Sequence, residues 1–184
     1  FDTDKYMLVG WETIDNGENT EAWALEMNAN ADQISDDLFG NSNFDDAFED
    51  VTVTDSGNFV YVGVKNAIRN DTASGYDFRD AWVYYESAVG NDWSETTIIN
   101  DNNVYESVST QGNRIVVAGR SYSKNGGNND NIATEFDTDG NQNWQLHIDG
   151  AGYQEINAVL ANNNETYFAG RGSQSDDEDL YDGT

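Results

Sequence analysis

The stretch IVVAG at residues 115–119 is one of four short apolar stretches that end in glycine, and their spacing indicates the fold. The others are YMLVG at 6–10, YVG at 61–63 and YFAG at 167–170. The glycines lie 53, 56 and 51 residues apart, at Gly10, Gly63, Gly119 and Gly170. Similarity at a near-constant interval is the mark of a repeat architecture. The sequence therefore predicts a repeated unit of about 50 residues.

Further stretches recur in phase with these glycines. Before the glycine stretch stand AFEDVTVT at 47–54, VYESVST at 104–110 and EINAVLA at 155–161. After it stand EAWALEM from Glu21, DAWVYYE from Asp80 and DNIATEF from Asp130. Short runs rich in β-branched and aromatic residues, separated by turns such as DSGN, QGN and NNNE, are typical of antiparallel strands. The pattern predicts four strands in each repeat.

This repeat, which includes FDTDGNQNW at 136–144, resembles the blades of quinoprotein-type β-propellers and of related repeat propellers in secreted and surface proteins of archaea and bacteria. The resemblance implies an all-β propeller or propeller-like array of four-stranded antiparallel blades. Residues 104–110 would form the innermost strand, 114–119 the second, 132–136 the third and 144–148 the outermost. Quinoproteins have one more residue between the positions of Asp137 and Gly140, so the resemblance does not extend to a quinone cofactor.

The repeats divide the chain into a single propeller-like domain or fragment over residues 1–184. We expect a partial blade at 6–46, whole blades at 47–103 and 104–154, and a partial blade at 155–184 whose third strand lies near Leu180. The open ends would belong to a longer chain or pair with neighbouring copies. Trp93 and Trp144 each stand 26 residues before the next recurring glycine. By the resemblance, both would dock against neighbouring blades.

The charge balance narrows the environment and the partners. The chain has 35 Asp and Glu against 8 Lys and Arg, a formal net charge of −27, and no cysteine. A field of this sign repels nucleic acid and anionic membranes, and no apolar run is long enough for membrane insertion. Concentrated salt relieves the repulsion among the carboxylates. We expect a salt-adapted extracellular protein at a cell or virion surface; an ordinary acidic secreted protein is the alternative.

One acidic loop invites a metal-binding interpretation. Glu135, Asp137 and Asp139 alternate and Gly140 follows, as at the start of an EF-hand loop, and they could hold calcium or a bound monovalent cation. The twelfth position is Leu146 where an EF-hand has a bidentate Glu. A tight hairpin turn led by Asp-Gly is therefore the favoured interpretation. No cofactor is established by the sequence.

Catalysis has little support in the sequence. The lone histidine, His147, alternates with Trp144 along its strand and is expected on the opposite face. No nucleophile pattern accompanies it, so an enzyme is not favoured.

The long connection at 65–80 is the expected partner site, because Arg69, Tyr76, Phe78 and Arg79 interrupt its acidic surroundings. We expect a non-catalytic structural or adhesive module that contacts a protein or glycan at a surface. The alternative is a carbohydrate-binding or carbohydrate-cleaving propeller protein with its ligand over the central channel. Sequons at Asn70 and Asn164 fall in expected turns.

Overall fold

The computed structural model of the chain describes residues 5–14, 19–41, 43–68, 78–99, 102–122, 129–148 and 152–173. Over these residues the chain forms thirteen strands and no helix, which confirms the expected all-β class. None of the described residues lies in a helix long and apolar enough to cross a membrane.

The strands fall into four consecutive groups along the chain. The first group is β1 (Lys5–Ile14), β2 (Asn19–Asn28) and β3 (Gln33–Phe39). The second is β4 (Asp45–Val53), β5 (Phe59–Ile68), β6 (Phe78–Glu86) and β7 (Trp93–Thr97). The third is β8 (Asn102–Gln111), β9 (Arg114–Tyr122), β10 (Asn129–Asp137) and β11 (Gln142–Ile148). The last is β12 (Gln154–Asn162) and β13 (Glu165–Gly172); the strand expected near Leu180 lies outside the described residues.

Each group pairs antiparallel, in chain order, to form the first, second, third and fourth sheets. Along the antiparallel pairs of the third sheet, β8 lies at one end and β11 at the other. A single parallel bridge between Arg79 and Asn102 joins the second and third sheets into one continuous eight-stranded sheet. Strands that neighbour each other in the chain also pair with each other within every sheet.

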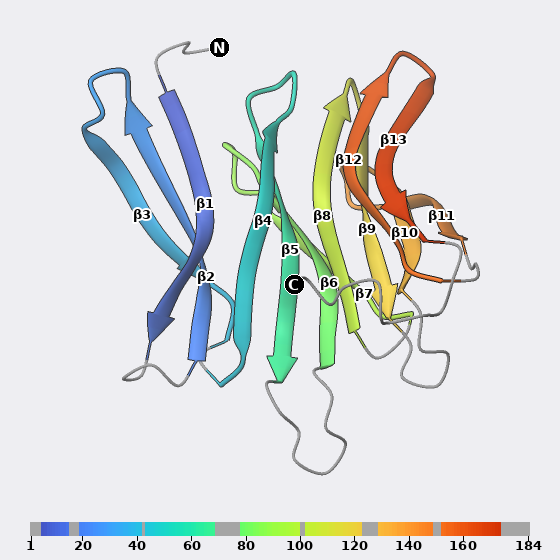
Figure 1. Cartoon of the computed structure of the whole chain (residues 1–184). Helices are drawn as coiled ribbons and strands as arrows, with labels where there is room; N and C mark the ends of the chain where they lie inside the picture. The colour runs from blue at the N-terminus through green and yellow to red at the C-terminus, as the bar shows by residue number, and fades with distance from the viewer. Residues whose placement is uncertain are drawn as a thin grey trace.

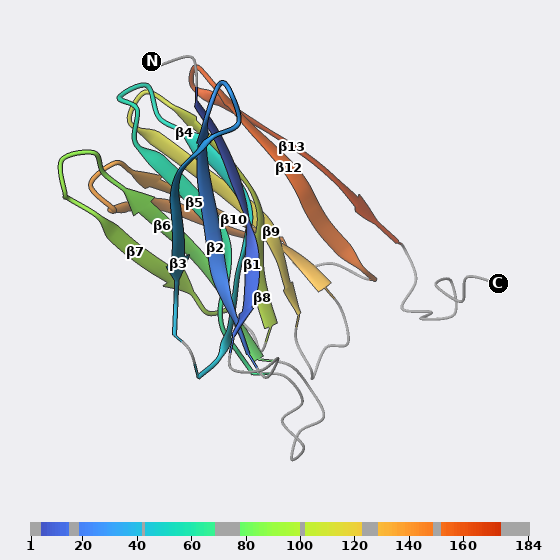
Figure 2. The ribbon, with the colours of Figure 1, turned by 90° about the vertical axis from the view of Figure 1, so that its left-hand side faces the viewer.

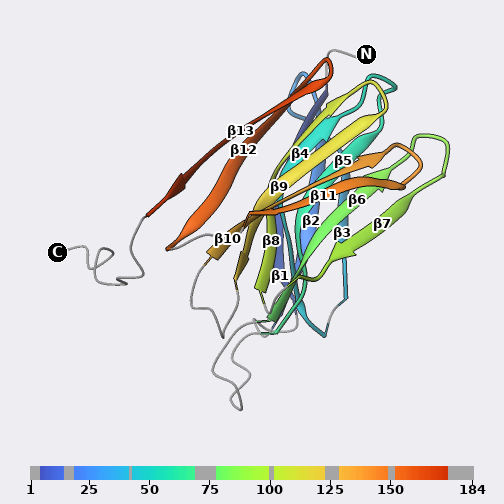
Figure 3. The ribbon, with the colours of Figure 1, turned by 90° about the vertical axis from the view of Figure 1, so that its right-hand side faces the viewer.

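The four sheets stand side by side in chain order (Figure 1). Views from either end show the first and the fourth sheet at opposite ends of the row (Figures 2 and 3). The strands β4, β8 and β12 contact one another in sequence, β4 with β8 and β8 with β12. We call these three the inner strands.

A hydrophobic cluster fills each of the three spaces between successive sheets. Between the first and second sheets the buried residues are Ala22, Ala24, Phe48, Tyr61 and Trp82. Between the second and third they are Val60, Val62, Ala81, Val83, Tyr85, Tyr105, Val108, Ile115, Val117, Ile132 and Phe136. Between the third and fourth they are Val116, Ala118, Ala133, Ile156, Val159 and Ala161. The core is therefore divided among the sheet interfaces.

The continuous apolar run in β9 follows from this stacking. Successive side chains of a strand point to opposite faces of its sheet. Ile115 and Val117 pack toward the second sheet, and Val116 and Ala118 pack toward the fourth. A strand covered on both faces needs apolar residues at every position, which explains the stretch IVVAG.

The recurring glycines face bulges in the inner strands. Gly63, Gly119 and Gly170 pair with Phe48, Tyr105 and Ile156, and the register shifts just after each of these partners. The bulge brings a backbone carbonyl against the glycine, so an added Cβ would lie well inside 3.0 Å of the oxygen of Ala47, Val104 or Glu155, respectively. Only glycine allows this approach.

Candidate functional site

An arginine at the start of β9 connects the third sheet to the fourth. The Nε of Arg114 donates to Glu135 Oε2 in β10 at 2.9 Å. Its Nη1 donates to the carbonyl of Asn163 at 2.7 Å, and its Nη2 donates to Thr166 Oγ1 at 2.8 Å. Both acceptors lie at the β12–β13 turn. One guanidinium therefore contacts both sheets.

A larger cluster lies toward the other end of β9 and forms the candidate functional site. We call it the Arg120 cluster: Glu106, Arg120, Tyr153, Glu155, Asn157 and Arg171. The Nη2 of Arg120 lies 3.3 Å from Glu106 Oε1 within the third sheet. Its Nη1 lies 3.0 Å from Glu155 Oε2 in the fourth sheet. The cluster thus spans two inner strands.

Glu155 is the centre of this cluster and is only 4% exposed. Its Oε1 accepts from Arg171 Nε and Asn157 Nδ2, both at 2.7 Å, and its Oε2 accepts from Arg120 and from the Tyr153 hydroxyl. Burial by itself raises the pKa of Glu155, but these hydrogen bonds outweigh burial and lower it to about 2. Glu155 therefore stays ionised near neutral pH.

The charges continue along the inner strands into the second sheet. Glu49 of β4 occupies the position of Glu106 of β8, one residue after the glycine partner. Glu49 is exposed, yet partial desolvation raises its pKa, and the negative charge of Glu106 raises the pKa further. Arg120 and Arg79 act in the opposite direction. The charges of Glu106, Arg120 and Arg79 are thus close enough to shift the pKa of Glu49.

The Arg120 cluster does not repeat from sheet to sheet. The position of Glu155 is held by Ala47 in β4 and by Val104 in β8. The position after the recurring glycine holds Arg120 and Arg171 in the third and fourth sheets, but Val64 in the second. A local departure from the repeat distinguishes a specific site from the general scaffold.

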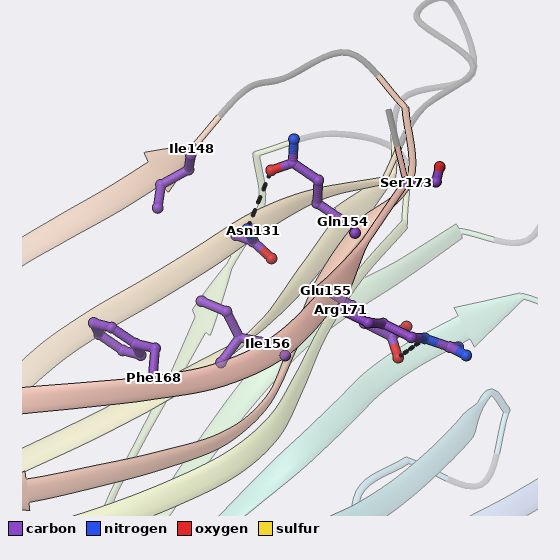
Figure 4. A pocket seen from close by; sticks show the side chains of 10 residues that line it. Asn131, Ile148, Gln154, Glu155, Ile156, Phe168, Arg171 and Ser173 are labelled. Atoms are coloured by element: carbon purple, nitrogen blue, oxygen red, sulfur yellow. Dashed lines mark hydrogen bonds and ion pairs between the residues drawn. The ribbon is translucent and has the colours of Figure 1, made fainter. Parts of the chain in front are cut away.

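A pocket of about 470 Å³ borders the cluster between the third and fourth sheets. Figure 4 shows Ile156 and Phe168 on one side and the Glu155–Arg171 ion pair on another. Gln154 lies beside Asn131 in the same view and accepts a hydrogen bond from it at 3.2 Å. Apolar walls with a few polar groups suit a small polar ligand that has one apolar face.

The residues predicted to bind a partner are only partly described. Arg69 and Tyr76 lie outside the described residues. Phe78 and Arg79 begin β6, and both are half-buried. The carbonyl of Arg79 accepts from Asn103 Nδ2 at 3.2 Å, which joins this strand to β8. The positive charge of Arg79 also lowers the pKa of Glu49 in β4.

The three residues predicted as metal ligands have different surroundings. Glu135 is buried and bonds to Arg114 and Asn143. Asp137 accepts from the backbone N–H groups of Asp139 and Asn141, both at 2.9 Å, and from Asn141 Nδ2. These bonds, with the Asn141 amide the strongest, lower the pKa of Asp137. Asp139 is exposed in the turn.

The turn around Asp137 is held by hydrogen bonds among its own residues. Gly140 has a φ of 86°, which suits glycine, and its N–H donates to the carbonyl of Asp137 at 3.1 Å. Over the described ranges, no group of three or more His, Cys, Asp or Glu residues is arranged to hold a metal ion.

His147 pairs with an acid on the neighbouring strand. Its Nε2 lies 3.4 Å from Asp130 Oδ2, and its side chain is 32% exposed. His147 aligns with Ile132 across the β10–β11 pair. This geometry gives the histidine a structural contact at the outer edge of the third sheet.

The two recurring tryptophans lie at sheet interfaces. Trp93 of the second sheet stacks on Tyr85 with ring centroids 5.3 Å apart and contacts Phe136 of the third sheet at 5.7 Å. Its Nε1 donates to the carbonyl of Thr138 at 3.0 Å. Trp144 packs against the cluster between the third and fourth sheets.

Sequence reasoning missed every member of the Arg120 cluster. A signal was present, because arginine follows the recurring glycine in two repeats of a chain that has only 8 Lys and Arg. The sequence does not reveal that Glu155 accepts from both arginines, since that depends on the stagger between two sheets. Comparison with models of known protein families gives no match, and comparison with curated proteins gives none either.

The low pKa of Glu155 predicts a pH-dependent contribution to stability. A carboxylate with a lowered folded-state pKa stabilises the fold above its ordinary pKa of 4.5, and this contribution is lost as the pH falls toward 2. Glu155→Gln resembles the protonated form, so it should cost about 2–3 kcal/mol near pH 6 and much less near pH 2.

Denaturant unfolding of both proteins across this pH range, in concentrated salt, measures the difference. Glu95→Gln, at an exposed position of β7, should change stability by less than about 0.5 kcal/mol at each pH. A Glu155→Gln cost that is the same at pH 2 and pH 6 would contradict the prediction.

Proposed function

We propose that this chain is a non-catalytic structural or adhesive module, built as a β-propeller-like array, that works at a salt-exposed cell or virion surface. Four sheets stacked in chain order, with equivalent strands side by side, support the propeller-like arrangement. The same glycine-to-bulge contact in three sheets supports one repeated blade design.

The observation that carries this proposal is the recurrent linkage between neighbouring sheets. Asp50 Oδ2 of β4 accepts from the backbone N–H of Val108 in β8 at 2.9 Å. At the equivalent position, Ser107 Oγ of β8 accepts from the N–H of Val159 in β12 at 3.3 Å. Together with the two arginines of β9, these bonds use polar side chains to hold sheets together. Such use favours a rigid scaffold over a reactive centre.

Retention on a surface tests the adhesive role. Beads coated with the protein should be retained on envelopes of salt-adapted cells in concentrated salt, whereas beads coated with the heat-unfolded protein should be released. Equal retention of both would contradict adhesion by the folded module.

The pocket beside the Arg120 cluster favours a second candidate, a carbohydrate-binding module. Phe168 offers an apolar surface, and Asn131, Gln154 and Arg171 offer hydrogen-bonding groups around it. A glycan array in concentrated salt tests this alternative. Binding that Phe168→Ala and Arg171→Gln both abolish would favour the carbohydrate role over the purely structural one.

The acidic surface predicts stability that depends on salt. At about 10 mM salt the Debye length is roughly 30 Å, so most carboxylates of a chain with net charge −27 repel one another. At about 2 M salt only near neighbours interact. We expect the melting temperature to fall by at least about 10 °C from high to low salt, followed by circular dichroism. Sucrose of matched osmolality should not substitute for salt, and an unchanged melting temperature would contradict salt adaptation.

A further inference from the structure

The strand β1 has one paired edge and one open edge. Among the described strands it pairs only with β2, and it forms the end of the first sheet. The corresponding strands of the other sheets, β5, β9 and β13, each pair with an inner strand along this edge. An open edge presents backbone N–H and C=O groups that can pair with another strand.

Gly10 indicates what this edge is built to receive. It holds the position of the three glycines that meet a bulged inner strand, yet among the described residues no atom beyond Gly10 and its two chain neighbours lies within 4 Å of where its Cβ would stand. Gly10 is also absent from the glycines that have positive φ, so its own backbone does not require glycine. Neither the backbone conformation nor a described neighbour explains why glycine stands at position 10. The close approach of a further backbone would explain it.

The three internal examples define the shape of that further strand. The residue opposite each glycine is large and apolar, and valine follows three positions later; the pairs are Phe48 and Val51, Tyr105 and Val108, and Ile156 and Val159. All six side chains pack toward the preceding sheet. By the same register, the apolar residue would lie opposite Gly10 and the valine opposite Leu8. Leu8 is 41% exposed, and Tyr6, two residues before it on the strand, is 58% exposed.

The row of inner strands would continue through the new strand. Val108 donates its N–H to Asp50 of β4, and Val159 donates its N–H to Ser107 of β8. Each acceptor lies two residues after the large apolar residue that faces the recurring glycine. The equivalent N–H of Val51 donates instead to Asp50 of its own strand, at 2.9 Å. β1 already contacts β4 through the cluster that contains Met7 and Val9. A further strand on β1 would therefore be continuous with an existing interface.

Charge also selects the occupant. The residue after the apolar position is Glu49 in β4 and Glu106 in β8, and the two carboxylates repel each other. In the new strand, the residue directly after the large apolar residue would lie next to Glu49. A lysine or arginine there would be attracted to Glu49 and to the strongly negative chain as a whole.

We propose that the open edge of β1 is a docking site for an extended strand of a separate polypeptide. The strand carries a large apolar residue opposite Gly10, then a basic residue, then serine or aspartate, then valine. The docked strand pairs antiparallel to β1, adding to the first sheet as in other cases of strand addition. This site goes beyond the proposed function and stands independently of it.

A peptide with the sequence of residues 102–111 and the change Glu106→Lys tests the proposal, because it contains the pattern Tyr, Lys, Ser, Val. Fluorescence anisotropy of the labelled peptide in concentrated salt should show saturable binding to the wild-type protein. Gly10→Ala should weaken binding by about tenfold or more, since its methyl group would meet the bulged carbonyl; tenfold corresponds to about 1.4 kcal/mol. Thr13→Ala, on the same strand, should bind the peptide as the wild type does.

The melting temperature separates this site from other occupants of the edge. We expect Gly10→Ala to melt at the wild-type temperature or slightly above it when no peptide is present. If Gly10→Ala unfolds at markedly lower temperature, a segment of the same molecule fills the edge and the proposal is wrong. Self-association that Gly10→Ala abolishes would assign the edge to a second copy and would equally overturn it, as would a wild-type protein that does not bind the peptide.

Discussion

Gly119→Ala is expected to cost about 3 kcal/mol or more of unfolding free energy, while the same change at Gly10 costs nothing measurable. The added methyl group at position 119 would overlap the carbonyl oxygen of Val104 and press on backbone atoms of Tyr105 and Glu106. Backbone atoms cannot rotate away as a flexible side chain can. The β8–β9 pair would have to separate, and β9 contributes side chains to two hydrophobic clusters.

Denaturant unfolding in concentrated salt, with Gly10→Ala measured alongside, checks this result. Alanine at position 10 has open space and should be neutral or stabilise by up to about 1 kcal/mol, because it restricts the unfolded chain. Gly63→Ala should resemble Gly119→Ala, since its methyl group would overlap the carbonyl of Ala47. Similar losses at positions 10 and 119 would show that the glycines have another purpose.

The repeat was predictable because the same backbone contact recurs at a near-constant interval. Gly63, Gly119 and Gly170 stand out in the sequence without any knowledge of the bulges that require them. Strand order within the third sheet was predictable because strands that are consecutive in the chain usually lie next to each other in a sheet. The bulges themselves were not predictable, because they exist only in the pairing of two strands.

The candidate site was not predictable for a different reason. Arg120 reaches Glu155 across two sheets, 35 positions later in the chain, and the contact occurs once. A single long-range contact leaves no periodic mark in one sequence. Composition also hid it, because Glu155 is one of 35 acids that the sequence alone could not rank.

The acidic turn shows how the same residues allow two interpretations. Alternating acids before a glycine resemble the start of a calcium loop, and that spacing is the only information in the sequence. In the structure Glu135 bonds to Arg114, and Asp137 accepts hydrogen bonds from its own turn. The two acids are two residues apart on β10, yet Glu135 is buried beside Arg114 while Asp137 lies at the end of the strand, where the turn begins.

Trp93→Ala is expected to destabilise the protein by about 3–5 kcal/mol, because the indole fills the space between the second and third sheets. It stacks nearly parallel to Tyr85, with 6° between the rings, and meets Phe136 from the next sheet. Gly140 also leaves room for it, since a Cβ there would stand 3.1 Å from the ring. Removing the indole therefore leaves a cavity bordered by two sheets and a turn.

Two variants separate the contributions to this effect. Trp93→Phe retains an aromatic ring but loses the hydrogen bond to Thr138, so it should cost less, with about 1 kcal/mol attributable to that bond. Trp11→Ala should change stability by less than about 0.5 kcal/mol, because Trp11 is 59% exposed. Unfolding by denaturant in concentrated salt, followed by far-ultraviolet circular dichroism, measures all three.

A double-mutant cycle with Phe136→Ala identifies the inter-sheet part of the loss. If Trp93 stabilises the interface between sheets, the coupling energy between positions 93 and 136 should reach about 0.5–1.5 kcal/mol, the range of close aromatic pairs. Additive losses at the two positions would mean that Trp93 stabilises only its own sheet through Tyr85. In that case the recurrent tryptophan would be a feature of the single blade, and the second and third sheets would be held together by the aliphatic cluster alone.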